Sequence, residues 1–426
     1  MVRSMGMDEK ALVKEADEVR SVLRNINWDF NQKVSFPPSG VKPFNCRKHH
    51  WFPATFVPEI PFTLIEVLTY PQAVVYDPFA GIGTTYFQAL LLCRRPLATE
   101  ICRVAIEYMQ SLLVLFNPNI EHKILKEKIK NILTDFDPGK DYIGSVSATL
   151  IKKLKPWYSE NVLNQLAFLF VKEANCQDNT LKSAMRISIS SILKTVSAQD
   201  RGWGCIADNV LPKTHQIENS KNKNALHLFE KHINNLLKDI SEHLKYIPKK
   251  EYKQLYRDIK RQKTILYEDV QKCTGIPNES VDLVVTSPPY PNMADYIKSQ
   301  RLSYYFFGFD LNKDLMKEIG TRSKRSRKNA LQSYFEEMQK SIENISKKLK
   351  GGGYACFVMP VFTEDNENNR KRKIIVDKVM NSAMEYGLLL GKEDKYERIL
   401  PSIRRSHNIK WATLEKEMIY IFRKEE

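Results

Sequence analysis

The stretch Val-Asp-Leu-Val-Val-Thr-Ser-Pro-Pro-Tyr at 281–290 decides how the chain is expected to fold. Four of its first five residues are Val or Leu, the pattern of a strand buried on both faces. Two prolines stop the strand, because proline cannot donate a ladder hydrogen bond, and they hold Ser287 and Pro288 extended. We expect the Ser287 hydroxyl and both residues' carbonyls to face outward as acceptors beside the Tyr290 ring. Such a cluster could hold a planar, amine-bearing ring, although an ordinary strand and proline-rich turn would have the same sequence.

A second stretch, 74–85, reads Val-Val-Tyr-Asp-Pro-Phe-Ala-Gly-Ile-Gly-Thr-Thr and leads into an apolar helical run that reaches Cys93. A strand with an acid at its tip, a glycine-bearing turn and a helix form a nucleotide-type site at the carboxyl end of the strand. Gly81 and Gly83 let a ligand approach the backbone closely. A G-x-G is weak evidence alone, but together with 286–290 it makes a strong signal.

These two stretches closely resemble the two signature motifs of the S-adenosylmethionine-dependent amino-methyltransferases of DNA. The serine in the first place of the second motif is similar to the N4-cytosine branch, whereas the N6-adenine branch usually carries Asp or Asn there. The resemblance covers roughly 45–110 and 264–424. It implies an α/β fold with a Rossmann-like class I methyltransferase sheet. The catalytic residues that it implies are Ser287, Pro288, Pro289 and Tyr290.

Flanking residues extend the cofactor site that the resemblance implies. Phe52, Pro53 and Ala54 resemble the element that covers the methionine end of the cofactor. Glu100 resembles the ribose ligand, and Asp269 resembles the carboxylate that accepts from the adenine amine. From the residues alone, the first segment could equally be a proline-rich connector, and Glu100 a carboxylate at a helix N-terminus. The full cofactor-binding set is Phe52, Pro53, Ala54, Asp77, Pro78, Phe79, Ala80, Gly81, Gly83, Thr84, Thr85, Glu100, Ile101, Asp269 and Val270.

The strand pattern is interrupted over 111–262, where apolar residues recur at helical spacing. An insertion of this length is too long for an ordinary connection, and we expect a mainly helical target-recognition region. The chain then divides into an N-terminal helical arm (1–44), a first core part (45–110), the insertion (111–262) and a second core part (263–426). The expected helices are 7–25, 159–172, 185–196, 221–263, 331–349 (stopped by the glycines at 351–353) and 373–390. The expected strands are 74–77, 96–100, 264–269, 281–287, 354–359 and 417–424.

The chain carries 66 Lys and Arg residues against 50 Asp and Glu, a formal net charge of +16. A surplus of this size suits a polyanionic partner such as DNA, although a lysine-rich proteome would also make the protein basic. One run of basic residues without an acid follows the catalytic strand. Such a run is usually a solvated loop, but its position favours contact with DNA phosphates. Its members are Arg322, Lys324, Arg325, Arg327 and Lys328.

The seven cysteines are scattered, without a C-x-x-C pair or a metal-like spacing with histidine. This pattern favours reduced thiols and a cytoplasmic protein, and it predicts no metal site. No apolar run approaches the length of a membrane span, and the N-terminus lacks a secretory apolar region. We therefore expect no membrane association.

The resemblance implies methyl transfer from S-adenosylmethionine to the N4 amine of a cytosine flipped out of duplex DNA. The sulfonium methyl is already activated, so no metal is required. Ser287 and the Pro288 carbonyl would accept hydrogen bonds from the amine and aim its lone pair, and Tyr290 would stack on the base. A 5-methylcytosine mechanism needs a cysteine nucleophile, and none stands beside the Pro-Pro motif. A cognate restriction endonuclease is a candidate partner.

Three alternatives stay open at this point. An N6-adenine enzyme differs by a single side chain, and Pro-Pro-Tyr turns also serve amino-methylation of RNA bases. A third alternative is a nucleic-acid-binding protein that binds the cofactor without catalysis. Intact residues at Asp77, Gly81, Gly83, Glu100 and Ser287 argue against this last alternative, because a degenerate enzyme usually loses some of them.

Overall fold

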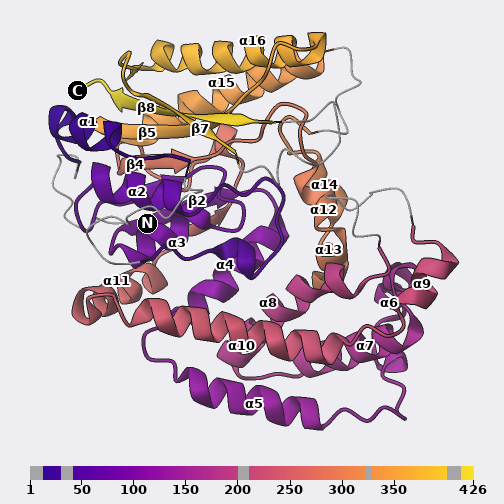
Figure 1. The fold of residues 1–426 in the computed structure, drawn as a ribbon. Coiled ribbons are helices and arrows are strands. Elements are labelled where there is room, and N and C mark those ends of the chain that lie inside the picture. The colour runs from indigo at the N-terminus through magenta and orange to yellow at the C-terminus, as the bar shows by residue number, and fades with distance from the viewer. Residues whose placement is uncertain (1–12, 30–41, 200–210, 322–328, 401–413) are drawn as a thin grey trace.

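The computed structural model describes residues 13–29, 42–199, 211–321, 329–400 and 414–426. It is an α/β protein built on one mixed sheet of eight strands (Figure 1). The predicted α/β class is therefore confirmed. The strands are β1 (Val74–Asp77), β2 (Arg95–Glu100), β3 (Ile265–Tyr267), β4 (Val281–Thr286), β5 (Leu349–Val361), β6 (Leu388–Leu389), β7 (Lys395–Ile399) and β8 (Lys416–Lys424).

The strand order is β3-β2-β1-β4-β5-β8-β6, and β7 also pairs with β8. Strands β3, β2, β1, β4 and β5 run parallel, while β8 is antiparallel to its neighbours. The two motif strands, β1 and β4, lie side by side, with Val75 opposite Leu283 and Tyr76 opposite Val284. The chain leaves β1 toward β2 on one side and returns to β4 on the other, which makes this a topological switch point. The arrangement is compatible with a Rossmann-like fold.

Helices cover both faces of the sheet, so alternate residues of each central strand enter different cores. Val74 and Val284 face α15 (Ala330–Lys348) and α16 (Glu367–Ser382), which lie above the sheet in Figure 1. Val75 and Leu283 face the other way, toward α1 (Ala16–Arg24), α2 (Glu59–Leu68) and α3 (Thr84–Leu91). This burial on both faces explains why apolar residues dominate the two motif strands.

The segment between β2 and β3 is helical in its described part, as the sequence predicts. Its helices pack below the sheet and against α3 (Figure 1), and one hydrophobic cluster runs from Tyr86 and Met109 through Ile189 to Ile233. The helical region therefore shares the core of the sheet instead of standing apart from it. Its members are α4 (Arg103–Leu115), α5 (His122–Thr134), α6 (Ala148–Leu154), α7 (Glu160–Ala174), α8 (Asn179–Val196), α9 (Thr214–Ser220), α10 (Ala225–Leu244) and α11 (Lys249–Arg261).

Three short helices follow β4: α12 (Tyr296–Ser299), α13 (Arg301–Phe307) and α14 (Leu311–Leu315). They form a column between the edge of the sheet and the helical region in Figure 1. The aromatic residues of α13 pack into the shared core, for example Phe306 against Phe170 of α7, with ring centroids 4.9 Å apart. Among the described helices, none combines the length and apolarity that crossing a bilayer requires.

The structure corrects several predicted element boundaries. The single helix expected over 221–263 is two helices, α10 and α11, because Pro248 cannot continue a helix and instead caps α11. The glycines at 351–353 do not stop α15, which ends at Lys348, but lie within β5. A Cβ atom on Gly353 would lie 2.9 Å from the Asp282 carbonyl oxygen, so glycine is needed for the close approach of β5 to β4.

Other boundaries differ by a few residues. Helix α16 begins at Glu367, before the predicted 373, and ends at Ser382, leaving room for the unpredicted β6. Strand β7 was also not predicted. Of the helix predicted at 7–25, Ala16–Arg24 is helical, and residues 7–12 lie outside the described residues.

Candidate functional site

A pocket opens at the carboxyl ends of β1, β2, β3 and β4, at the switch point of the sheet. It encloses about 820 Å³ that no protein atom fills, part of it open to solvent. The pocket brings together segments that are far apart in the sequence, from 52–56 to 317–319. The predicted site residues that line it are Phe52, Pro53, Ala54, Pro78, Phe79, Ala80, Gly81, Thr84, Glu100, Ile101, Asp269, Val270, Ser287 and Pro289.

The other predicted site residues, Asp77, Gly83, Thr85, Pro288 and Tyr290, are buried behind this lining. Thr85 donates a hydrogen bond of 3.1 Å to the Val285 carbonyl, which ties the start of α3 to β4. Gly83 adopts φ = +84°, a left-handed conformation that favours glycine, and caps α3. These residues shape the pocket from behind.

Asp77 ends β1 with a carboxylate that is almost fully buried. Its Oδ1 accepts hydrogen bonds from the Phe79 amide (3.1 Å) and the Thr286 hydroxyl (2.7 Å). Its Oδ2 is buried without a hydrogen-bond partner among the described residues. Burial raises the pKa of Asp77 to about 6, although the Thr286 hydrogen bond opposes the shift. Asp77 is thus a titratable group directly beneath the glycine turn.

Glu100 ends β2 and joins the glycine turn to the start of α4. Its Oε2 accepts from the Gly81 amide (2.7 Å), and its Oε1 accepts from the Ile101 and Cys102 amides (2.8 Å each). A carboxylate has about four acceptor sites, so one site on Oε2 stays available toward the pocket. Burial raises the pKa of Glu100, and the three amides oppose this. The two interpretations of Glu100 are therefore compatible, because it both holds a helix N-terminus and lines the pocket.

Aromatic side chains form one wall of the pocket. A Cβ atom on Gly81 would lie 3.3 Å from the Phe52 ring, so this glycine lets the ring rest on the turn. The Phe52 and Tyr296 rings are stacked, with centroids 6.2 Å apart and an interplanar angle of 29°. Tyr296 was not among the predicted site residues.

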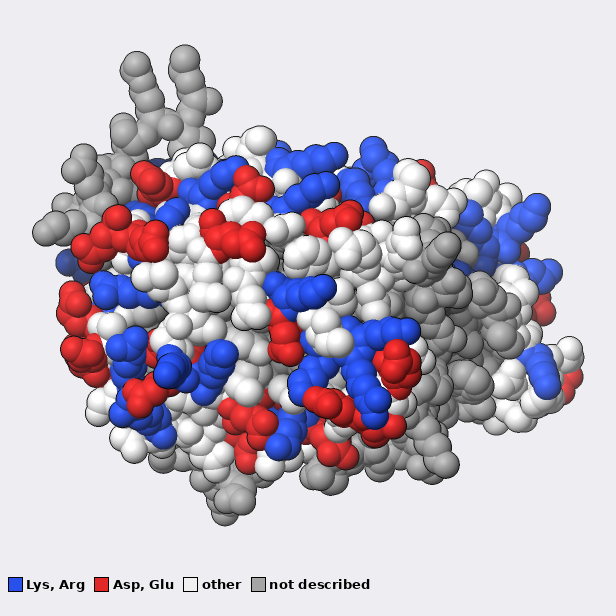
Figure 2. Space-filling model, turned by 90° about the horizontal axis from the view of Figure 1, so that it is seen from above, with Lys and Arg blue, Asp and Glu red and all other residues white. Residues whose placement is uncertain are grey.

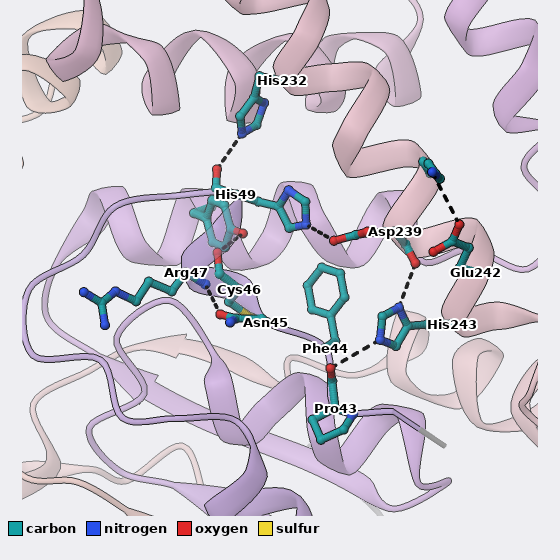
Figure 3. Close-up of polar contacts among 12 residues, drawn as sticks. Pro43, Phe44, Asn45, Cys46, Arg47, His49, His232, Asp239, Glu242 and His243 are labelled. Carbon is teal, nitrogen blue, oxygen red and sulfur yellow. Dashed lines mark hydrogen bonds and ion pairs between the residues drawn. The ribbon is translucent and has the colours of Figure 1, made fainter. Parts of the chain in front are cut away.

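The segment before Phe52 is held by helix α10, as Figure 3 shows. The Nε2 atom of His49 lies 2.9 Å from Oδ2 of Asp239, and Nε2 of His232 lies 2.7 Å from the His49 carbonyl oxygen. His243 contacts the Asp239 carbonyl at 2.7 Å and the Pro43 carbonyl at 3.3 Å (Figure 3). The helical region therefore helps to fix the position of Phe52–Ala54 in the pocket lining.

Burial lowers the pKa of three histidines in this region, His49, His50 and His232. The pKa of His50 falls to about 4 and that of His232 to about 3, while that of His49 is lowered despite the nearby Asp239. His50 lies between the Trp51 carbonyl (3.0 Å) and the Ser190 hydroxyl of α8 (2.9 Å). These rings are neutral at pH 7 and serve as hydrogen-bonding links between the segment and the helices.

Asp269 begins a 3₁₀ helix, Val270–Lys272, and accepts from the Gln271 amide at 3.0 Å. Its neighbour Glu268 also lines the pocket. Across from them, Lys317 contacts the Tyr267 hydroxyl at 2.9 Å. The carboxylate predicted to meet the adenine amine is therefore at the pocket, with a second acid beside it.

Sequence reasoning missed part of the lining: Thr55, Phe56, Ile82, Cys102, Glu268, Tyr296, Ile297, Lys317, Glu318 and Ile319. The acids that end the strand at 264–269 were a signal for Glu268. The segment 317–319 had no signal, because remote contacts place it. Glu318 accepts from the Tyr296 amide at 2.5 Å, and the buried Asp314 accepts from the Tyr304 hydroxyl at 2.7 Å.

The turn after β4 places Ser287 and Pro289 in the pocket. The Pro289 carbonyl accepts a hydrogen bond of 2.9 Å from Tyr334 of α15, which fixes the turn. Tyr290 differs from expectation, since its side chain is 6% exposed and its hydroxyl donates to Glu417 of β8 at 2.8 Å. A buried phenol needs an acceptor, and Glu417 draws the ring out of the pocket lining. Because the Tyr290 ring is buried, it has no open face in this structure on which a base could stack as predicted.

The basic run Arg322, Lys324, Arg325, Arg327 and Lys328 lies outside the described residues, so its contact with DNA stays a prediction. The face over α15 and α16 shows acidic and basic side chains interspersed (Figure 2). The excess positive charge of the chain is therefore not gathered into a single basic surface on that face.

No family model matches the sequence, and no curated protein matches it. The chemistry of the pocket is then the main guide to its ligand. Among the described residues that line it are four acids, Glu100, Glu268, Asp269 and Glu318, and one base, Lys317. This balance among the described lining residues disfavours a phosphate-bearing ligand and suits one that carries positive charge.

Proposed function

We propose that the protein is a DNA methyltransferase that uses S-adenosylmethionine to methylate the N4 amine of a flipped cytosine. One observation carries this proposal: Ser287 and the turn after β4 share a pocket with Gly81, Glu100 and Asp269. The two motifs that resemble the amino-methyltransferases of DNA thus meet at one site, although about 200 residues separate them in sequence. A binding protein without catalysis has no need for an acceptor cluster beside its ligand.

The pocket fits S-adenosylmethionine better than a dinucleotide. This cofactor carries a sulfonium, an ammonium and a carboxylate group, a net positive charge without a phosphate, which agrees with four acids and one lysine among the described lining residues. Glu100 would accept a ribose hydroxyl at its remaining Oε2 site, and Asp269 would accept from the adenine amine. Phe52, Pro53 and Ala54 would cover the methionine end. When bound, the cofactor supplies an activated methyl group.

The residues of the turn supply orientation. An exocyclic amine is a weak nucleophile, because its lone pair is delocalised into the ring. Hydrogen bonds accepted by the Ser287 hydroxyl and the Pro288 carbonyl would draw on the amine protons and turn the lone pair toward the methyl group. Holding both reactants in this geometry supplies a large share of the rate acceleration. Tyr296, which lines the pocket, offers an aromatic face near the turn.

DNA is the proposed partner on two grounds. The formal charge of +16 favours a polyanion, and the motif resemblance is to enzymes of DNA. Serine at 287, in place of Asp or Asn, favours cytosine over adenine as the target. A target base must leave the duplex to reach a pocket of this depth.

The test is nucleoside analysis after reaction with methyl-labelled cofactor. We would supply unmethylated genomic DNA as duplex and as single strands, and structured RNA, because a mixed sequence offers every recognition site. We expect N4-methylcytosine in duplex DNA, formed more slowly by Ser287→Ala because one of the two acceptors is removed. Ser280→Ala is the matched control, because its hydroxyl donates to the Pro277 carbonyl (2.7 Å) at an exposed turn and does not line the pocket.

Other outcomes would correct the proposal in different ways. N6-methyladenine would change the target base but keep the site, and label in RNA alone would change the partner. Cofactor binding without transfer to any substrate would contradict an enzymatic function. Label at carbon 5 of cytosine would contradict the chemistry assigned to Ser287.

A further inference from the structure

A buried ion pair lies behind the turn that follows β4, and the function proposed above assigns it no role. Arg398 of β7 is 1% exposed and Glu417 of β8 is 3% exposed. The Nη1 atom of Arg398 lies 3.3 Å from Oε2 of Glu417. Burying two charges is costly, and such a pair is weak evidence for stability alone.

The ion pair connects to the pocket through hydrogen bonds. The Tyr290 hydroxyl donates to Oε1 of Glu417 at 2.8 Å, and the Ser287 hydroxyl donates to the Tyr290 oxygen at 3.4 Å. The second contact is long, as catalytic hydrogen bonds often are before the substrate arrives. Ser287 is the member of this chain that lines the pocket.

The hydrogen bonds that link Ser287, Tyr290 and Glu417 all donate in the same direction, toward Glu417. A carboxylate paired with arginine only accepts hydrogen bonds, so Tyr290 must direct its proton at Glu417. Burial raises the pKa of Tyr290 well above its usual value, which keeps this proton on the phenol. The Tyr290 oxygen can then only accept from Ser287, and the Ser287 proton points away from the pocket.

We infer that Glu417, held by Arg398, is a positioning residue that fixes the Ser287 hydroxyl as a hydrogen-bond acceptor toward the pocket. This inference rests on the proposed function. A serine hydroxyl both donates and accepts. If Ser287 donated into the pocket, it would bind the lone pair of the amine that has to attack. The direction imposed by Glu417 leaves that lone pair free and offers the amine protons an acceptor.

The decisive variant is Tyr290→Phe, which removes one hydroxyl and keeps both the ring and the ion pair. We expect kcat to fall at least tenfold, with cofactor affinity and KM for DNA within twofold of wild type. Tyr256→Phe is the matched control, because it removes another buried hydroxyl. This hydroxyl donates to the Leu113 carbonyl at a distance of 3.1 Å, and neither residue lines the pocket. Its kcat is expected to match wild type.

A double-mutant cycle separates positioning from a merely structural role. In the Ser287→Ala background, Tyr290→Phe should have no further effect on kcat, because no hydroxyl remains to be oriented. Glu417→Gln should also lower kcat when residue 287 is Ser, but should have no further effect in the Ser287→Ala background. If this substitution unfolds the protein because Arg398 loses its ion pair with Glu417, the Tyr290→Phe cycle still tests the inference.

The outcomes distinguish this inference from the function on which it rests. An active wild type with an equally active Tyr290→Phe variant overturns the positioning role alone. Additive losses in the cycle overturn it as well, since they show that Tyr290 acts independently of Ser287. A wild type inactive on every substrate overturns the proposed function and removes this inference with it.

Discussion

The Thr286 hydroxyl donates a 2.7 Å hydrogen bond to Oδ1 of Asp77, joining the last residues of two neighbouring parallel strands. Both residues are buried. The bond therefore connects the two sequence motifs at the floor of the pocket. It also stabilises the charged form of Asp77, whose pKa burial raises to about 6.

Thr286→Val keeps the shape of the side chain and removes this donor. Since a hydrogen bond to a charged group contributes about 1.5–3 kcal/mol, we expect a loss of that order in the free energy of unfolding at pH 8. The pKa of Asp77 should rise further in the variant. The loss should then be smaller at pH 4, where Asp77 is protonated in the folded state. Denaturant unfolding at both pH values measures the difference.

Thr286→Ser is the control, because it keeps the hydroxyl. We expect its unfolding free energy to depend on pH as in wild type. Equal behaviour of the Val and Ser variants at both pH values would show that the bond to Asp77 contributes no charge-dependent stability.

The neutral state of His50 should make the protein sensitive to acid. Its folded pKa of about 4 lies below the usual 6.5, so the folded state binds fewer protons than the unfolded state. The stability from this ring is complete above pH 6.5 and is lost as pH falls toward 4. At 1.36 kcal/mol per pKa unit, the loss is about 3 kcal/mol.

His50→Gln removes the titrating ring, and the test compares its unfolding free energy with wild type between pH 4 and 8. We expect the difference between the two proteins to change across this range, with the wild type losing more stability toward pH 4. The titration of Asp77, which has the opposite sign, is common to both proteins and cancels in the difference. Parallel curves would exclude a buried, neutral His50.

The sequence predicts the central sheet well for a physical reason. Strands β1 and β4 are buried on both faces, so apolar residues dominate both, and a proline follows each strand within two residues. The glycines of the turn are a sequence signal for the pocket, because Gly81 and Gly83 adopt positive φ angles of +51° and +84°. Local sequence therefore determines these elements and the residues that line the pocket between them.

The parts that the sequence did not predict depend on distant partners. Tyr290 is drawn away from the pocket by Glu417, which is 127 residues later in the chain. His49 is fixed by Asp239 across 190 residues. The glycines at 351–353 are typical of a helix stop, yet they lie in β5 because the neighbouring β4 comes so close. None of these contacts leaves a periodic pattern in the sequence.

Gly83 and Gly308 separate two effects of a glycine substitution. Both have left-handed φ angles, +84° and +69°, and an alanine in that region costs about 1–2 kcal/mol. A Cβ atom on Gly308 meets nothing within 4 Å, whereas one on Gly83 would lie 2.9 Å from the Met109 side chain. We expect Gly83→Ala to destabilise more than Gly308→Ala by about 1–3 kcal/mol. Thermal unfolding would measure this, and equal losses would mean that Met109 moves aside without cost.

Glu100 offers the most direct test of cofactor binding. Glu100→Ala would leave three backbone amides without an acceptor, so reduced binding could reflect a disrupted turn. Glu100→Gln keeps one oxygen, which can still accept from Ile101 and Cys102, but replaces Oε2 with an amide group. That group cannot accept from Gly81 or from a ribose hydroxyl. We expect S-adenosylmethionine affinity to fall by about 1–3 kcal/mol, measured by calorimetry.

A cofactor analogue that lacks one ribose hydroxyl separates the ribose contact from changes in the turn. Wild type should bind the analogue that lacks the contacted hydroxyl more weakly than the full cofactor, because the Oε2 site then has no partner. Glu100→Gln has already lost this contact, so it should bind the two ligands with nearly equal affinity. The comparison is made with the 2′-deoxy and the 3′-deoxy analogue in turn. If Glu100→Gln loses as much affinity as wild type does on removal of either hydroxyl, Glu100 holds the glycine turn but does not bind the ribose.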